Sequence, residues 1–237
     1  MAEAAKGEGQ GAVVLLSGGM DSATLLHYVA RTLRAHPLRT LSLVYGQRHA
    51  RELEMAAWQA RAVGVAEHRV LDISFFGALT AGGSALTDPS IPVPDLAAIP
   101  PAQLGQPPTY VPHRNLAFLS LACAFAESVG VSRVYYGAQA QDAYGYWDCT
   151  APFVERLNAL LCLNRGRAVS VEAPFVGKSK RDVLGLGLEL GVDFAHTWTC
   201  YRGGDRPCGT CPSCAERAAA FAAAGVADPA APELRES

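Results

Sequence analysis

The sequence predicts an α/β protein with a doubly wound, mostly parallel sheet and a small cysteine-containing module at its C-terminal end. Strand-like and helix-like segments alternate along most of the 237 residues, an order typical of parallel sheets covered by helices on both faces. Four cysteines then fall between residues 200 and 214, where the chain becomes rich in glycine and proline. We therefore expect an α/β domain over residues 1–198 and a metal-binding module with a tail over residues 199–237.

The first half of the expected domain alternates strands with amphipathic helices. An apolar run predicts a strand at 12–16, and the helix-like stretch after it predicts a helix at 21–34. The run Thr-Leu-Ser-Leu-Val-Tyr predicts a second strand at 40–45, and a helix at 50–63 follows it and ends at a glycine, the residue favoured after helices. A third strand is expected at 68–73.

The second half repeats this alternation. A strongly apolar helix is expected at 116–128, a strand at 133–136, a helix at 152–162, a strand at 168–171 and a helix at 179–190. Glycines follow the first and last of these helices, as helix ends favour. Because ligands of such sheets bind beyond the carboxyl ends of the strands, we look for chemistry in the loops that follow the strands.

One segment interrupts the alternation. Residues 77–112 show little periodicity, and eight of the fifteen prolines lie between Pro89 and Pro112. A loop of this length in a compact domain is usually functional. An extended linker of polyproline II character is the alternative for residues 89–108.

The composition excludes several classes of protein. A chain that is 50% hydrophobic and 18% charged is not expected to be disordered. Its apolar runs are shorter than a membrane helix requires, and residues 1–11 lack the apolar core of a secretory signal, so we expect a cytoplasmic protein without a membrane segment. A net charge of −2 and the absence of a run of Lys or Arg count against a nucleic-acid partner.

The loop after the first strand has the composition of an anion site. It reads Leu16-Ser17-Gly18-Gly19-Met20-Asp21-Ser22. Glycines let backbone N–H groups approach an anion closely, and the N-terminus of the following helix adds positive potential. Asp21 would then hold Mg²⁺ or cap the helix. The loop lacks the Gly-Lys-Ser/Thr of a Walker motif, and the alternative is a plain strand–turn–helix with an N-cap.

The cysteine cluster predicts a metal site. Cys200, Cys208, Cys211 and Cys214 present four thiolates in a short turn, and soft sulfur ligands suit tetrahedral Zn²⁺. A redox pair of Cys208 and Cys211, or an iron–sulfur cluster, are the alternatives. Because the protein fills all four positions, the metal is expected to stabilise the module and not to activate water.

Together these motifs resemble one family, the 7-cyano-7-deazaguanine synthases of queuosine and deazapurine biosynthesis, within the ATP pyrophosphatase (PP-loop) superfamily. The resemblance extends over nearly the whole chain, and the matching strings occur in the order typical of the family. They are residues 16–22, 45–49 with Glu52, 111–115, 137–142, 145–149, Pro174 with Lys180, and 199–201 leading into the cysteine cluster.

The resemblance implies a fold, a reaction and partners. The fold would be adenine nucleotide alpha hydrolase-like, with residues 1–198 as the PP-loop ATP-binding domain. The reaction would use ATP and Mg²⁺ to adenylate the carboxylate of 7-carboxy-7-deazaguanine. Ammonia would then give the amide, and a second adenylation would allow dehydration to the nitrile, 7-cyano-7-deazaguanine. Similar enzymes are homodimers, so the resemblance also implies a dimer.

Residue roles follow from the resemblance and from chemistry. The first loop would bind ATP together with Gln47 and Arg48. Lys180 would add a positive charge at a phosphate, although an ordinary exposed lysine is the alternative. The residues expected to act in catalysis are Asp21, Ser22, Arg114 and Lys180. Those expected to bind the deazaguanine are His49, Arg114, Asp142, Tyr146 and Asp148.

Two positions depart from the family pattern. Trp147 replaces a proline in the usual Tyr-Pro-Asp-Cys, and His113 replaces a glycine in the usual Pro-Gly-Arg-Asn. Both lie where the resemblance places the substrate. The alternatives are therefore an enzyme that stops at the amide or passes the acyl group to another amine, on a small molecule or a protein. A PP-loop tRNA-modifying enzyme and a non-catalytic zinc module are further alternatives.

Overall fold

The computed structural model describes residues 10–48, 51–103, 106–140, 142 and 145–231. Its centre is a five-stranded parallel sheet with the order β3-β2-β1-β4-β5. The strands are β1 (Ala12–Leu15), β2 (Leu38–Val44), β3 (Glu67–Asp72), β4 (Arg133–Tyr135) and β5 (Ser170–Glu172). This confirms the predicted doubly wound parallel sheet, since the order reverses at β1.

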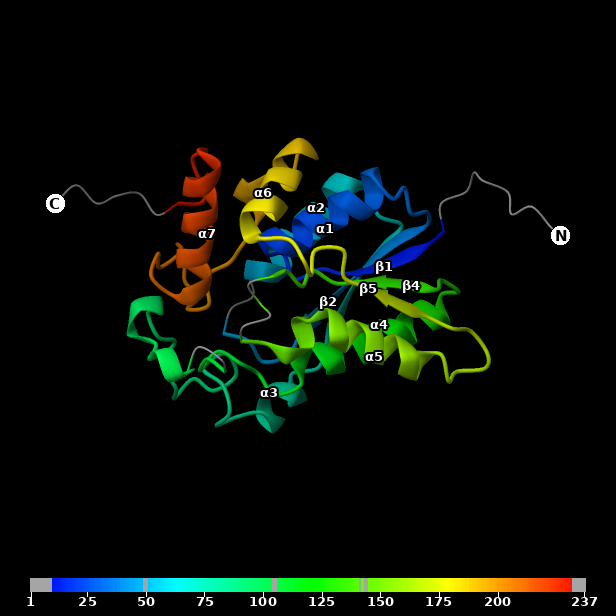
Figure 1. Ribbon diagram of the computed structural model, residues 1–237, viewed down its shortest axis with the longest axis horizontal. Coiled ribbons are helices and arrows are strands. Elements are labelled where there is room, and N and C mark those ends of the chain that lie inside the picture. Colours follow the sequence, from blue (N-terminus) through cyan, green and yellow to red (C-terminus); the bar gives the residue numbers. More distant parts are fainter. Residues whose placement is uncertain (1–9, 49–50, 104–105, 141, 143–144, 232–237) are drawn as a thin grey trace.

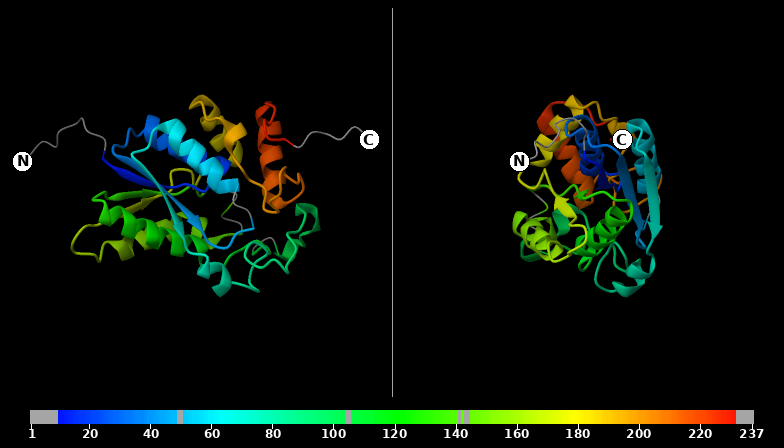
Figure 2. Two further views of the ribbon diagram at one scale, coloured as in Figure 1. Left: turned by 180° about the vertical axis from the view of Figure 1, so that it is seen from behind. Right: turned by 90° about the vertical axis from the view of Figure 1, so that its right-hand side faces the viewer.

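Helices cover both faces of the sheet (Figures 1 and 2). The helices α1 (Met20–Arg31), α2 (Arg51–Val63) and α6 (Lys180–Glu189) lie on one face, and α4 (Arg114–Ser128) and α5 (Ala151–Leu161) lie on the other. None of the helices in the described part of the chain is long and apolar enough to cross a membrane.

The alternation of side chains along β1 explains why both faces need a cover. Val13 packs into the core formed with α4 and α5, whereas Ala12 and Val14 pack into the core formed with α1 and α2. All three side chains are fully buried. A strand that is apolar on both faces is stable only between two layers of helices, which is the observed arrangement.

Two helices were not expected from the sequence. A short helix, α3 (Phe75–Leu79), follows β3, and a longer one, α7 (Pro212–Ala224), begins inside the cysteine cluster. Phe221 of α7 packs with Leu184 of α6 and with Phe194, in a third apolar cluster that also includes the start of α1. Short 3₁₀ helices also occur at Leu96–Ala98, Pro101–Gln103, Trp147–Cys149 and Phe194–His196.

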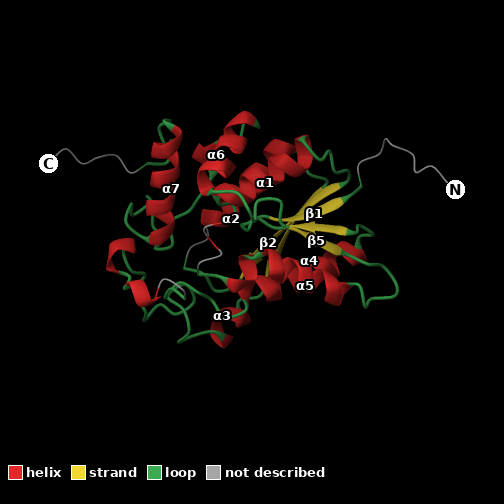
Figure 3. Cartoon of the chain, in the orientation of Figure 1, coloured by secondary structure: helices red, strands yellow, loops and turns green. Residues whose placement is uncertain are grey.

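The proline-rich segment lies at the same end of the molecule as α7 (Figure 3). The Leu96 amide donates to the Thr210 carbonyl at 2.9 Å, and the Arg202 guanidinium donates to the Val93 carbonyl and to the Asp95 carboxylate. The segment is therefore tied to the cysteine loop. It is part of a wall at the carboxyl end of the sheet, and not a linker between domains.

Candidate active site

A cavity of about 600 Å³ lies at the carboxyl ends of the strands, where the sheet order reverses. A volume of this size suits a small-molecule ligand. The sequence-predicted site residues that line it are Leu16, Ser17, Gly19, Met20, Asp21, Ser22, Gln47, Arg48, Arg114, Asp142, Tyr146 and Lys180. Gly18 and Asp148 lie behind the lining, and His49 is outside the described residues.

The loop after β1 forms a compact turn that is closed by its own hydroxyl groups. The Ser22 hydroxyl donates to the Gly19 carbonyl at 3.1 Å and accepts the Ser17 amide at 3.2 Å. The Ser17 hydroxyl lies 3.0 Å from the Ser22 hydroxyl. The turn leads directly into α1, so the N-terminus of this helix faces the cavity. The arrangement provides what an anion requires, N–H and O–H donors at the positive end of a helix.

Gly18 is required by close packing against α2. Its φ is +85°, and a Cβ atom there would lie 2.1 Å from the Glu52 carbonyl oxygen and 2.8 Å from the Ala56 amide nitrogen. The Trp198 amide also donates to the Gly18 carbonyl at 2.9 Å. Gly18 therefore lets the loop lie directly against α2 and the segment before the cysteine cluster, which explains why it is not in the cavity wall.

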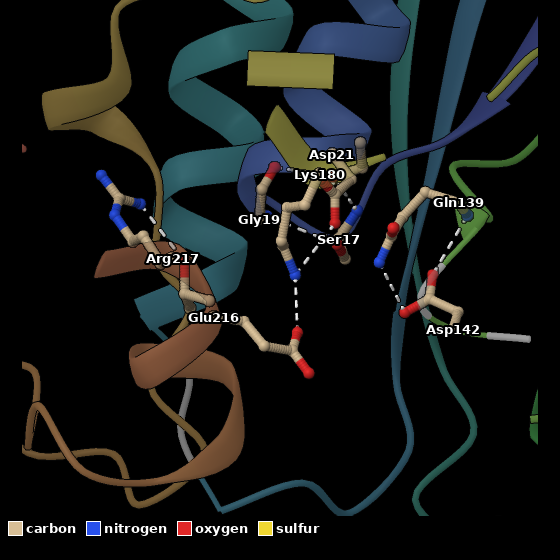
Figure 4. Close-up of polar contacts among 10 residues, drawn as sticks. Ser17, Gly19, Asp21, Gln139, Asp142, Lys180, Glu216 and Arg217 are labelled. Atoms are coloured by element: carbon tan, nitrogen blue, oxygen red, sulfur yellow. Dashed lines mark hydrogen bonds and ion pairs between the residues drawn. The ribbon is translucent and has the colours of Figure 1, made fainter. Parts of the chain in front are cut away.

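Lys180 lies between two carboxylates at the edge of this loop (Figure 4). Its Nζ atom is 2.9 Å from Glu216 Oε2 and 3.6 Å from Asp21 Oδ2. The lysine side chain is 10% exposed, so it is not an ordinary surface lysine. The neighbouring carboxylates hold the Lys180 pKa above its ordinary value despite the opposing effect of burial. Lys180 is therefore a cation held at the cavity wall.

Asp21 keeps one oxygen available. Its Oδ1 atom is buried and has no hydrogen-bond partner among the described residues. Burial raises the pKa of the Asp21 carboxyl, and the charge of Lys180 opposes that shift. A buried carboxylate oxygen without a partner is costly unless a cation or donor reaches it, so this atom fits a cation ligand.

Asp142 presents a second carboxylate to the cavity. The Gln139 amide N–H donates to Asp142 Oδ2 at 3.2 Å, and the Gln139 side chain donates to Oδ1 at 3.1 Å (Figure 4). Burial raises the pKa of Asp142 to about 6, and Lys180 opposes that shift. Asp142 is thus oriented by its neighbour, with both carboxylate oxygens accepting from Gln139.

Gln47 and Arg48 line the cavity, and their side chains hydrogen-bond to backbone groups. Gln47 accepts from the Tyr45 amide and donates to the Leu43 carbonyl, which closes the end of β2. Arg48 donates to the Ala85 carbonyl at 2.8 Å and to the Asp88 carbonyl at 2.6 Å. Arg48 therefore anchors the proline-rich segment to the end of β2.

A group of aromatic and charged side chains forms the other end of the cavity. Arg114 begins α4, and its guanidinium lies 5.9 Å from the centre of the Tyr45 ring. Tyr146 and Tyr201 also line this end, and the Tyr146 hydroxyl lies 3.0 Å from that of Thr109. A guanidinium among phenol rings suits a planar, partly anionic ligand.

Sequence reasoning did not assign a role to two acidic residues of this cavity. Burial raises the pKa of Glu52 to about 8, and the charge of Arg114 opposes that shift. Glu52 belongs to one of the strings that match the family, so the sequence did indicate that this residue could be functional. Glu216 had no such signal, because its partner Lys180 is distant in sequence and lies on another helix.

Asp148 lies beneath the cavity, where it supports the start of α4. It is 2% exposed, and its carboxylate accepts from the Asn115 backbone amide and side chain, both at 3.2 Å. Asn115 itself lines the cavity and also donates to the Cys149 sulfur at 3.2 Å. In the described structure Asp148 thus contacts Asn115, and Asn115 faces the ligand space.

The two departures from the family pattern contact each other outside the cavity lining. The His113 and Trp147 rings are in edge contact, with centroids 5.6 Å apart, and Trp147 Nε1 donates to the Tyr110 hydroxyl at 2.9 Å. His113 has φ +55°, a conformation that favours glycine. The positive φ therefore explains why glycine is usual at position 113, and neither His113 nor Trp147 lines the cavity.

The four C-terminal cysteines converge as expected. The sulfur atoms of Cys200, Cys208, Cys211 and Cys214 all lie within 4.8 Å of one another. Backbone amides of Cys208 and Cys211 donate to the sulfurs of Cys200 and Cys208, at 3.4 Å and 3.3 Å. Four thiols at this spacing, with N–H donors to their sulfurs, fit one tetrahedral metal ion.

Comparison with known proteins points to the same family as the sequence motifs. The family model described as "Queuosine biosynthesis protein QueC" matches residues 11–225. A relative from Marinobacter nauticus named 7-cyano-7-deazaguanine synthase is 44% identical over 222 residues, covering 93% of this chain and 96% of the relative. One of the same name from Caldicellulosiruptor saccharolyticus is 44% identical over 218 residues, covering 92% and 93%.

A solved structure supports the fold alone. NMN synthetase from Francisella tularensis has a TM-score of 0.51 and 18% identity, covering 92% of this chain and 79% of the other. The sequence relatives are more similar than this, at 44% identity, and the family model spans the loop after β1, the cavity and the cysteine cluster. The chain belongs to the family of the queuosine biosynthesis protein QueC.

Proposed function

We propose that this chain is an ATP-dependent carbon–nitrogen ligase that converts 7-carboxy-7-deazaguanine to 7-cyano-7-deazaguanine with ammonia, by way of the amide. The proposal rests on one observation: the loop after β1 and the Arg114 side chain line the same cavity. A triphosphate at the loop and a carboxylate at Arg114 would face each other within one space. Catalysis would then rest on positioning and on charge stabilisation.

The chemistry assigns each end of the cavity a task. A carboxylate oxygen attacks the α-phosphorus of ATP, the bond to the β-phosphate breaks, and pyrophosphate leaves. The nitrogen of ammonia then attacks the acyl carbon, loses a proton and displaces AMP. In the second round the amide oxygen attacks the α-phosphorus of a second ATP and pyrophosphate leaves. AMP then departs with that oxygen, and loss of the nitrogen-bound protons gives the nitrile. The donors of the loop and Lys180 would stabilise the pyrophosphate, and Arg114 would hold the carboxylate.

Mg²⁺ fits the charges at the loop. Asp21, Asp142 and Glu216 place three carboxylates around one ammonium, that of Lys180. A triphosphate would add further negative charge, so a divalent cation is needed to neutralise it. Asp21, with its buried oxygen without a partner, would hold the ion together with phosphate oxygens, as Mg²⁺ sites commonly do. The ion would supply charge neutralisation at the phosphates.

Zn²⁺ is the metal we propose for the four cysteines. Four thiol ligands leave no open position, so the ion would stabilise the fold and not take part in the reaction. Cys211 is the N-cap of α7 and Cys214 lies in its first turn, so the ion would hold the start of that helix. A cytoplasmic location, free ammonia as the nitrogen source and a homodimer complete the proposal.

Exchange of labelled pyrophosphate into ATP tests the adenylation. We expect exchange that requires 7-carboxy-7-deazaguanine and that falls to background in Asp21→Ala. Glu155→Ala, an exposed change on α5 of the opposite face, is the matched control and should exchange like the wild type. Wild-type protein that binds the deazaguanine but shows no exchange and forms no AMP contradicts the proposal.

A further inference from the structure

The Lys180 ammonium is held by a residue from the C-terminal helix. Glu216 Oε2 lies 2.9 Å from Lys180 Nζ, whereas the nearer oxygen of Asp21 lies at 3.6 Å, beyond ordinary hydrogen-bond distance (Figure 4). The Glu216 contact is therefore the shorter of the two. Both side chains line the cavity beside the phosphate loop.

The backbone on both sides of this contact is fixed. Lys180 is the first residue of α6, and the capping box between Ser179 and Asp182 fixes that helix start. Glu216 lies on α7 next to Arg217, which donates to both oxygens of Asp228 at 2.8 Å and to the Phe194 carbonyl at 3.0 Å. The side chains of Arg217 and Asp228 are 5% and 11% exposed, so this set of bonds is largely shielded from solvent.

A lysine side chain has many rotamers, so a fixed backbone alone does not fix its ammonium. Lys180 Nζ has three protons to donate, and Glu216 accepts one of them. A carboxylate on a rigid helix thus selects the rotamers that keep the ammonium beside the loop.

We propose that Glu216 is a positioning residue that holds the Lys180 ammonium at the phosphate loop for the ATP-cleaving step. The proposal rests on the proposed function, because it assigns Lys180 to the phosphates of ATP. It also gives α7 a role in the reaction. The helix begins in the cysteine cluster, so the cluster fixes the element from which Glu216 reaches the active site.

The expected kinetic effect falls on turnover. Without Glu216, Lys180 samples other rotamers, and misplacement of a charged group by about 1 Å costs up to ~100-fold in rate. We expect Glu216→Ala to lower kcat by about tenfold. The KM for ATP should change by less than about threefold, because removal of a negative charge near the triphosphate offsets the weaker hold on Lys180. Glu216→Gln, which keeps an acceptor, should recover most of kcat.

A double-mutant cycle tests whether Glu216 acts through Lys180. Pyrophosphate release is measured for wild type, Glu216→Ala, Lys180→Ala and the double variant, with Glu155→Ala as the surface control. We expect the Glu216→Ala effect to shrink to less than about twofold in the Lys180→Ala background. Bound metal and unfolding midpoint should match the wild type, which a merely structural role would not allow.

The outcomes separate the two proposals. Wild-type protein that releases no pyrophosphate in the presence of the deazaguanine carboxylate refutes the proposed function, and this inference with it. An active wild type in which Glu216→Ala keeps full kcat overturns the inference alone. Equal effects of Glu216→Ala in both backgrounds also overturn it. If Glu216→Ala does not fold, the same cycle is read with Glu216→Met, which keeps the length of the side chain but has no carboxylate, and equal effects in the two backgrounds again overturn the inference.

Discussion

Gly18→Ala should be among the most damaging single-methyl substitutions in this chain. Alanine at φ +85° costs about 1–2 kcal/mol, because the Cβ atom clashes with its own backbone in the left-handed region. The new methyl would also lie 2.1 Å from the Glu52 carbonyl oxygen, so α2 or the loop must shift. Such overpacking costs about 1–3 kcal/mol. The expected loss is therefore about 2–5 kcal/mol of unfolding free energy, a large share of the ~5–15 kcal/mol typical of a domain.

A matched control separates the two costs. Gly64 has φ +75°, but a Cβ atom there would have nothing within 4 Å. Gly64→Ala should therefore lose only the backbone cost of about 1–2 kcal/mol. Urea denaturation followed by circular dichroism gives both values under the same conditions. If the two variants lose equal stability, the packing of the loop against α2 is not as described.

Three further predictions concern other parts of the chain. Arg217→Ala should cost about 3 kcal/mol of unfolding free energy in urea, because it leaves the Asp228 carboxylate, which is 11% exposed, without its cation; an unchanged midpoint would contradict this. The pKa of Asp142 is raised from 3.8 to about 6, so the folded state holds this proton more tightly than the unfolded state. Stability should therefore fall as pH rises from about 4 to 6, and Asp142→Asn should flatten that part of the profile; identical profiles would refute the shift. Purified protein should carry about one zinc per chain, and Cys211→Ser should lose the metal and unfold α7, as elemental analysis and amide exchange would report; full helicity without metal would contradict it.

The alternation of strands and helices was predictable because each element has its own local signal. The predicted segments match β1 to β5 and the helices α1, α2, α4, α5 and α6, with small shifts at their ends. The helix α7 was missed because its first turn consists of cysteine-cluster residues, whose glycines and prolines indicate a loop. Only the packing of Phe221 against α6 shows why the alanine-rich remainder is helical.

The parts of the site formed by residues close in sequence were also predictable, whereas contacts between distant residues were not. The loop from Leu16 to Ser22 was predictable because neighbouring residues form it, and so was the cysteine cluster. The contact between Glu216 and Lys180 was not, because it joins two helices through side chains alone. Asp148 is the opposite case. It lies within a string that matches the family, yet its carboxylate contacts Asn115 and the residue lies behind the cavity lining.

The product of a complete reaction tests the central claim most directly. Purified protein is incubated with 7-carboxy-7-deazaguanine, ATP, Mg²⁺ and ammonium, and the deazaguanine products are identified by mass spectrometry over time. The account predicts transient amide followed by stoichiometric 7-cyano-7-deazaguanine, because one cavity serves both adenylations. Amide that accumulates without nitrile, or an acyl group transferred to another amine, would contradict it.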